Sequence, residues 1–150
     1  MNKPISLALF QPDMAPNAGA AMRLCAALGV SLHIIEPCGF PWDDRKIRRT
    51  GMDYVDQVDL TRHAAWDRFI SAQALNRIVL LTTKADMVYT DFTFKADDII
   101  LAGRESAGVP DNVHNAAAAR VIIPMQPGLR SLNVVNACAM VLGEALRQVK

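Results

Sequence analysis

The sequence has few of the features that mark disulfide-rich, metal-binding or membrane-spanning proteins. Its three cysteines, Cys25, Cys38 and Cys138, are far apart and form no CxxC pair, so neither a disulfide framework nor a zinc site is expected. No stretch approaches the roughly 20 uninterrupted apolar residues that a membrane-spanning helix needs. The apolar run at residues 5–10 is too short for the core of a signal peptide, and no small-residue cleavage site follows it. These absences favour a cytoplasmic protein.

An excess of either charge is also absent. Sixteen Lys and Arg residues against fifteen Asp and Glu residues give the 150-residue chain a net charge of +1. This balance excludes a strongly basic protein that binds nucleic acid through its total charge, so any RNA contact requires a local patch. The candidate patch is an expected short helix after Trp42 that carries Arg45, Lys46, Arg48 and Arg49. A solvated basic face is the ordinary explanation, and RNA contact becomes attractive only if the patch lies beside a binding crevice.

Several common catalytic and nucleotide-binding motifs are missing as well. The sequence contains no GxGxxG, no GxxxxGK[ST] and no GxSxG segment, which removes support for a Rossmann nucleotide site, a phosphate-loop ATPase or an esterase-type nucleophile. The three histidines are scattered, and His33 falls inside an expected strand, where a satisfied core residue is the usual role. No acid or base is assigned from these residues.

The residues that are present indicate an α/β fold. With 51% hydrophobic and 21% charged residues the chain is globular. Apolar runs of strand length at residues 5–10, 32–36, 78–82, 98–102 and 120–123 alternate with helical patterns at 17–28, 64–73 and 132–148. The strand-like runs are almost continuously apolar, which is typical of a parallel sheet covered on both faces. The alternation predicts a single domain over residues 1–150, with a mostly parallel open sheet and helices on both faces.

The segments after the expected strands should contain the functional residues, because ligands of open α/β sheets bind at the carboxyl ends of the strands. Asn17 follows the first strand as a natural helix N-cap, and Gly19 allows close backbone approach at the positive helix end, where an RNA phosphate could bind. Arg23 stands further along the same helix. The alternative is a simply capped helix with a surface arginine.

The later strands are followed by three more candidate segments. Leu81 closes the third strand, where it could equally be part of the core. Gly103 and Glu105 belong to a shaped turn after the fourth strand, for which a glycine-rich connection with a solvated glutamate is the alternative. The fifth strand leads through residues 124–133 to the last helix, which Ser131 or Asn133 could cap.

Taken together, these segments resemble the SPOUT superfamily of S-adenosylmethionine-dependent RNA methyltransferases. They look most like its small branch that 2′-O-methylates the wobble nucleotide of tRNA. Residues 17–25 are similar to the first family motif, the turn from Gly103 through Glu105 to Pro110 to the second, and residues 123–133 to the third. Residues 36–40 and 48–54 resemble segments typical of the wobble-modifying branch. Gly143 departs from the pattern, since close relatives often carry an aromatic residue there.

The resemblance implies a C-terminal trefoil knot, S-adenosylmethionine as cofactor, no metal, and a homodimer that pairs through helices including the last one. The implied cofactor residues are Leu81, Gly103, Glu105, Ile123, Met125, Ser131, Leu132 and Asn133. The implied catalytic residues are Arg23, Asn17 and Ser131, and Arg130 joins the basic patch as an RNA contact. Because a guanidinium keeps its proton up to a pKa above about 12, we expect Arg23 to place a phosphate or stabilise alkoxide charge rather than act as a base.

The expected reaction is 2′-O-methylation of the wobble ribose, at position 34 of the anticodon stem-loop, on cytidine or modified uridine in leucine tRNAs. Two alternatives stay open. The same chemistry could act on another tRNA or ribosomal RNA position, or the chain could be a non-catalytic RNA-binding module that retains the fold.

Overall fold

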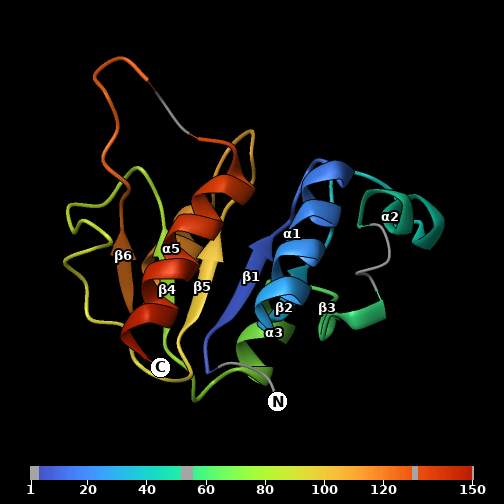
Figure 1. The fold of residues 1–150 in the computed structure, drawn as a ribbon, viewed down its shortest axis with the longest axis horizontal. Helices are drawn as coiled ribbons and strands as arrows, with labels where there is room; N and C mark the ends of the chain where they lie inside the picture. The colour runs from blue at the N-terminus through green and yellow to red at the C-terminus, as the bar shows by residue number, and fades with distance from the viewer. Residues whose placement is uncertain (1–3, 52–55, 130–131, 150) are drawn as a thin grey trace.

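A six-stranded parallel sheet forms the centre of the protein, in the order β3-β2-β1-β5-β4-β6 (Figure 1). The computed structural model describes residues 4–51, 56–129 and 132–149. The strands are β1 (Ser6–Phe10), β2 (Ser31–Ile35), β3 (Leu60–His63), β4 (Ile78–Leu81), β5 (Ile99–Ala102) and β6 (Ala119–Val121). Five of them confirm the expected strands with small shifts at their ends.

The register of the sheet explains why these strands are almost continuously apolar. Leu7 in the central strand β1 aligns with Leu32 of β2 on one side and with Ile100 of β5 on the other. All three side chains are fully buried. Parallel strands in the middle of such a sheet are covered on both faces, so neither face of the strand needs polar residues.

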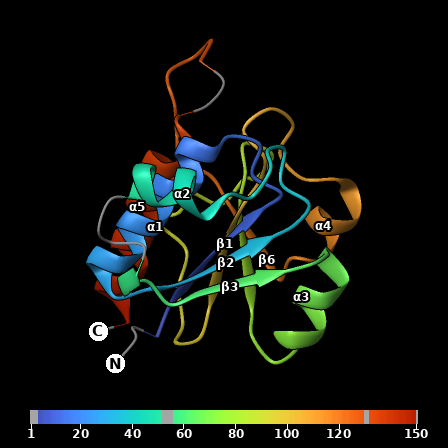
Figure 2. The same ribbon diagram turned by 90° about the vertical axis from the view of Figure 1, so that its right-hand side faces the viewer.

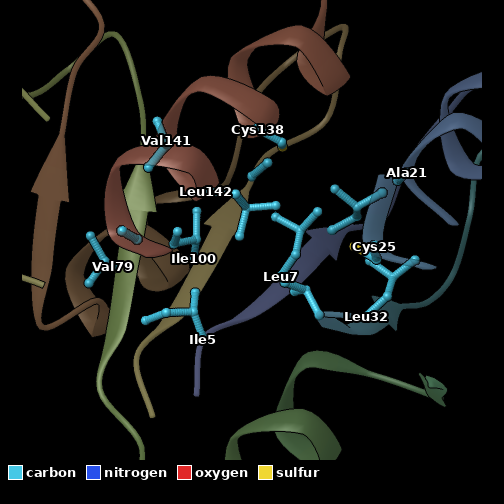
Figure 3. Close-up of a cluster of buried hydrophobic side chains, with 14 of the residues drawn as sticks. Ile5, Leu7, Ala21, Cys25, Leu32, Val79, Ile100, Cys138, Val141 and Leu142 are labelled. Atoms are coloured by element: carbon cyan, nitrogen blue, oxygen red, sulfur yellow. The ribbon is translucent and has the colours of Figure 1, made fainter. Parts of the chain in front are cut away.

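In the part of the chain that the structure describes, five helices cover the two faces of the sheet. They are α1 (Ala15–Leu28), α2 (Asp44–Gly51), α3 (Trp66–Ala72), α4 (Asp111–Ala116) and α5 (Val134–Gln148). Helices α1, α2 and α5 lie on one face and α3 and α4 on the other (Figure 2). On the first face, Cys25 of α1 and Cys138 of α5 are free thiols buried in a core with Leu7, Ile100 and Leu142 (Figure 3). The prediction of helices on both faces is confirmed.

The N-caps of helices α1 and α5 were both expected from the sequence, and the structure contradicts one expectation and confirms the other. The N-cap of α1 is Met14 and not Asn17, because Pro16 stands in the first turn, where its fixed φ and missing N–H start the helix earlier. The expected cap at Asn17 is therefore wrong. Asn133 does cap α5, since its side chain accepts hydrogen bonds from the backbone N–H groups of Val135 at 2.9 Å and Asn136 at 3.2 Å.

Strand β3 and helix α4 were not expected from the sequence. Strand β3 lies at the edge of the sheet and exposes two of its four residues, so it lacks the apolar run of the inner strands. Helix α4 has six residues, of which Val113 is buried. Within the described residues, no helix combines the length and apolarity needed to cross a membrane.

Candidate functional site

A cavity of about 490 Å³ opens at the carboxyl ends of β4 and β5. Its walls come from the start of α1, the ends of β4 and β5, the loop after β5, the segment after β6 and the beginning of α5. The volume falls in the range of sites that take small molecules and cofactors, about 300–1,000 Å³. Segments far apart in the chain meet here because parallel strands end at one edge of the sheet.

The cavity gathers the residues that the sequence selected for cofactor binding. Seven of the eight line it, and Asn17 does so too; the seven are Leu81, Gly103, Glu105, Ile123, Met125, Leu132 and Asn133. The eighth, Ser131, lies outside the described residues, as does Arg130. Sequence reasoning did not select Thr82, Thr83, Arg104, Ser106 or Val109, which also line the cavity and directly follow β4 and β5. Their position directly after a strand end is the feature of the sequence that could have identified them.

Apolar and polar side chains line different parts of the cavity. Leu80 and Ile123 are almost fully buried, and with the partly buried Leu81 they give an apolar wall. The ionisable groups among the described lining residues are Arg104 and Glu105. The Nε of Arg104 donates to the carbonyl oxygen of Gly108 at 3.0 Å, so this guanidinium braces its own loop.

The loop after β5 is a tight turn that requires glycine. A Cβ at Gly103 would lie 2.7 Å from the carbonyl carbon of Gly108, a distance that real side chains do not show. Gly108 itself has a φ of 63°, in the left-handed region that glycine adopts readily. Arg104 and Gly108 exchange two backbone hydrogen bonds of 2.9 Å between these positions. The absence of a side chain at Gly103 therefore lets the backbone of Gly108, in the same loop, come close.

Hydrogen bonds between side chains join three loops around the cavity. The Nδ2 of Asn133 donates to Oδ1 of Asn17 at 3.3 Å, and the Nδ2 of Asn17 donates to Oε1 of Glu105 at 3.0 Å. The other carboxyl oxygen of Glu105, Oε2, accepts the backbone N–H of Asp13 at 3.0 Å. The three segments that resemble family motifs are thus connected in space. Asn17 at the start of α1 and Asn133 at the start of α5 make the connection.

The carboxyl group of Glu105, which lines the cavity, has a raised pKa. Burial is the main cause that raises the pKa of its carboxyl, and the neighbouring carboxyl of Asp13 raises it further. The pKa of the Asp13 carboxyl is lowered to about 2, and the largest cause is its side-chain interaction with Glu105. Two adjacent carboxyl groups can shift each other's pKa values in opposite directions in this way.

The predicted RNA-contact residues of the basic patch lie away from the cavity within one chain. Arg45, Lys46, Arg48 and Arg49 are exposed on α2, which packs beside α1 through the buried Ile47. Arg48 forms an ion pair with Asp56 at 2.8 Å. Arg23 is likewise exposed on α1 and does not line the cavity. The structure therefore places Asn17, but neither Arg23 nor the patch, at the cavity of the same chain.

Trp42, which precedes the basic patch in the sequence, contacts other residues of the protein through its Nε1 and its ring. Its Nε1 donates to Oδ1 of Asp44 at 3.0 Å, and the guanidinium of Arg62 lies 4.4 Å from the ring centroid. Arg62 also pairs with Glu36, so this tryptophan fastens the start of α2 to the sheet edge. Tyr54, which follows the basic patch in the sequence, lies outside the described residues. Among the residues that are described, no cluster of three His, Cys, Asp or Glu side chains is arranged to hold a metal.

An open parallel sheet with a cofactor-sized cavity at its carboxyl edge defines an α/β protein that binds a small organic ligand at that edge. A family model described as the SpoU rRNA Methylase family matches residues 4–143, and the chain belongs to this family.

Individual relatives are similar over nearly the whole chain. A tRNA (cytidine(34)-2′-O)-methyltransferase from Beijerinckia indica is 61% identical over 145 residues, which cover 95% of this chain and 91% of the relative. A solved structure that gives insights into the 2-OH methylation of C/U34 on tRNA is 35% identical with a TM-score of 0.90, covering 96% and 95% of the two chains. The SpoU methyltransferase AviRb from Streptomyces viridochromogenes, solved with AdoMet, has the same fold, with 24% identity, a TM-score of 0.85 and coverage of 99% and 62%.

Proposed function

We propose that this protein transfers a methyl group from S-adenosylmethionine to the 2′-hydroxyl of the wobble ribose, nucleotide 34, of tRNA. One observation carries the proposal beyond family membership: the residues selected from three separate motifs line a single cavity. The relative that is 61% identical has this activity in its name, and its similarity covers the segments that form the cavity. The substrate base is cytidine or a modified uridine, in the anticodon stem-loop.

The cavity fits the cofactor in size and chemistry. The apolar wall formed by Leu81 and Ile123 offers a slot for a flat base such as adenine, with the backbone of neighbouring residues available for hydrogen bonds. Met125 and Leu132 extend this wall, while Glu105 and Asn133 provide polar partners. Ser131 and Gly103 complete the proposed set. The bound cofactor supplies an activated methyl group on a sulfonium, which needs no metal to react.

The protein has two tasks in the reaction, to align the reacting atoms and to stabilise charge on the ribose oxygen. Alignment of oxygen, carbon and sulfur can supply a large part of the rate enhancement. We assign Asn17 and Ser131 to orientation, because Asn17 already bridges Glu105 and Asn133 at the cavity. Arg23 places an RNA phosphate or stabilises the developing alkoxide, since its guanidinium does not give up a proton at neutral pH.

A homodimer explains why Arg23 and the basic patch lie outside the cavity of their own chain. In a symmetric pair, cationic residues of one chain can face the cavity of its partner. Large exposed apolar side chains at Met14, Leu132 and Met140 belong to α1, α5 or the residues that lead into them, and these neighbouring helices would form the interface. Sedimentation of the purified protein should give twice the chain mass, and Met140→Glu should shift the equilibrium towards single chains.

Three finer expectations belong to the same proposal. The C-terminal segment threads through a loop as a trefoil knot, the preferred substrates are leucine tRNAs, and the enzyme acts in the cytoplasm. The path of the chain supports the first, since β6 lies at the sheet edge and α5 returns to pack against β5 and α1. The exposed cations of α2 would bind the anticodon stem, and we assign Arg130 to the same contact.

The direct test is methyl transfer from labelled S-adenosylmethionine to total tRNA, followed by mass spectrometry of nuclease fragments. We expect a 2′-O-methyl group on a wobble pyrimidine. A methyl group on another ribose would keep the chemistry but overturn the target. Cofactor binding without transfer to any tRNA or ribosomal RNA would favour an RNA-binding module.

A further inference from the structure

Two loops beside the cavity hold each other through hydrogen bonds to carboxyl groups. Asp13 lies in the loop between β1 and α1, and Glu105 and Ser106 lie in the loop after β5. The backbone N–H of Asp13 donates to Oε2 of Glu105 at 3.0 Å. In return, Oδ2 of Asp13 accepts from the hydroxyl of Ser106 and from the backbone N–H of the same residue at 3.4 Å. Each loop therefore supplies a carboxyl group to donors of the other.

The donors around the two carboxyl groups suit their ionised forms. Oε2 of Glu105 accepts from Asp13, and Oε1 accepts from Nδ2 of Asn17 at 3.0 Å, so each oxygen faces an N–H group. Both hydrogen bonds to Oδ2 of Asp13 come from Ser106. Hydrogen bonds to a charged acceptor are roughly twice as strong as those between neutral groups. No Lys or Arg of the described residues forms an ion pair with either carboxyl group, so these neutral donors make the contact.

Asp13 is the fixed side of this contact. A Cβ at Gly39 would lie 2.6 Å from Cβ of Asp13, so the loop after β2 packs directly against this residue. The backbone N–H of Gly39 donates to the carbonyl oxygen of Pro12 at 2.9 Å, and that of Gln11 donates to the carbonyl oxygen of Ile35 at 2.8 Å. These bonds fasten the segment before α1 to the end of β2. The sheet therefore holds Asp13, and Asp13 holds the loop after β5.

Ser106 and Asp13 differ in their relation to the cavity. Ser106 lines it together with the rest of its turn, whereas Asp13 does not. The two backbone hydrogen bonds of 2.9 Å between Arg104 and Gly108 fix the shape of this turn. Bonds within a turn do not fix its direction relative to α1, and the contacts with Asp13 and Asn17 do. Asp13 thus acts on the wall of the cavity from outside it.

We propose that Asp13 is a positioning residue for cofactor binding, which acts through Ser106 to hold the loop after β5 where it lines the cavity. The inference rests on the proposed function, because it takes S-adenosylmethionine as the ligand. A loop that is ordered before the ligand arrives does not have to be immobilised during binding, so the contact increases affinity. Loss of the contact should weaken cofactor binding and leave the groups that react with the ribose in place.

A double-mutant cycle on Asp13 and Ser106, measured by calorimetric titration with S-adenosylmethionine, tests the inference. Asp13→Ala removes the acceptor and Ser106→Ala removes the hydroxyl donor, and each change should lower the affinity by about tenfold. The double variant should bind about as well as either single variant, because the same contact is lost in all three. If Ser106 contacted the cofactor directly, the two losses would instead multiply.

Two further readouts distinguish positioning from a general loss of structure. Asp13→Asn keeps an oxygen that accepts from Ser106, so it should recover most of the affinity that Asp13→Ala loses. In steady-state assays, Asp13→Ala should raise the KM for S-adenosylmethionine and leave kcat and the KM for tRNA nearly unchanged.

The controls are matched changes far from the contact. Asp67→Ala and Ser71→Ala, at exposed positions of α3 on the opposite face of the sheet, should bind the cofactor normally. Circular dichroism verifies that each variant is folded. Ser106→Ala changes an exposed residue, so it tests the contact even if Asp13→Ala does not fold.

The outcomes separate this inference from the proposed function. Wild-type affinity in Ser106→Ala, multiplied losses in the double variant, or no recovery in Asp13→Asn would overturn the role of Asp13 and leave the proposed function standing. Absence of cofactor heat with the wild-type chain would overturn the proposed function, and this inference with it. Cofactor binding without methyl transfer to any tRNA would overturn the proposed reaction alone, because the affinities of the variants would still decide the role of Asp13.

Discussion

Asn17 and Glu105 are joined by a 3.0 Å hydrogen bond that links helix α1 to the loop after β5. The two residues are 88 positions apart in the chain, and both line the same cavity. Because Asn17 also accepts from Asn133, it is the central member of a bridge between three loops. The loops that would hold the cofactor are therefore positioned by one amide side chain.

Replacing Asn17 should weaken cofactor binding without unfolding the protein. Asn17→Ala removes both side-chain hydrogen bonds of the bridge, one of them to the carboxyl group of Glu105. A hydrogen bond to a charged group contributes about 1.5–3 kcal/mol, or roughly tenfold to a hundredfold in affinity. Calorimetric titration with S-adenosylmethionine measures the loss. Asn115→Ala on α4, at an exposed position on the opposite face of the sheet, is the matched control and should bind normally. Equal affinities of the two variants would remove Asn17 from the site.

Replacing Arg23 should separate binding from catalysis. Arg23→Ala is expected to lower methyl transfer by about 10²–10³-fold, the typical effect of losing a group that stabilises charge in the transition state. The affinity for S-adenosylmethionine should stay nearly unchanged, because Arg23 does not line the cavity of its own chain. Arg68→Ala on α3 provides an exposed arginine as control. A parallel loss of cofactor affinity and methyl transfer would contradict the role given to Arg23.

The parts of the fold that could be predicted are those in which local sequence and burial agree. Strands β1, β2, β4 and β5 are covered on both faces, so each appears in the sequence as an almost unbroken apolar run. Edge strand β3 contains Thr61 and Arg62 at exposed positions, and nothing in the residues 60–63 alone distinguishes it from a loop.

Some residues of the site could likewise be predicted from the sequence, and others could not. Glu105 and Asn133 could be selected because they follow strand ends and match family motifs, and Asn133 is one of the two residues that the sequence offers as the cap of the last helix. The partnership of Asp13 with Glu105 could not be predicted, since the two are 92 positions apart and an acidic residue before a helix has many ordinary roles. Asn17 was expected to cap its helix, and Pro16 gave that helix an earlier start.

Two glycine-to-alanine substitutions should change stability in opposite directions. Gly143 lies in the exposed side of α5, where a Cβ would meet no atom within 4 Å, so Gly143→Ala should raise the free energy of unfolding by up to about 1 kcal/mol. Gly103→Ala would bring a Cβ within 2.7 Å of backbone atoms and should lower it by about 1–3 kcal/mol. Urea denaturation of both variants checks the pair. Destabilisation by Gly143→Ala would show that this face of α5 is covered.

The buried histidine pair should make the protein less stable in acid. Nδ1 of His33 and Nε2 of His63 are 2.9 Å apart. Burial is the main cause that lowers both pKa values, that of His33 from 6.5 to about 4, with the charge of His63 as its second cause. Between these pH values the unfolded chain binds protons that the folded chain does not, so the free energy of unfolding should fall by on the order of 2 kcal/mol as the pH drops.

Denaturation at a series of pH values measures this dependence. His33→Gln should reduce the slope between pH 6.5 and about 4, whereas His114→Gln on α4 should leave it intact. If the wild type and His33→Gln lose stability in parallel across that window, the histidine pair is not its source.

The basic patch on α2 should contribute to tRNA affinity and not to the chemical step. Charge reversal at Arg45, Lys46 and Arg49 is expected to raise the KM for tRNA and leave kcat nearly unchanged, because the three side chains are exposed and lie outside the cavity. Each lost phosphate contact should also reduce the slope of log affinity against log salt by about 0.7–0.9. Filter binding of an anticodon stem-loop over a range of salt concentrations measures that slope. Arg68→Glu on the opposite face changes the net charge by the same amount as any one of these reversals made alone, and it should change neither quantity. Equal effects of Arg68→Glu and of a single reversal in the patch would assign the result to net charge instead of the patch.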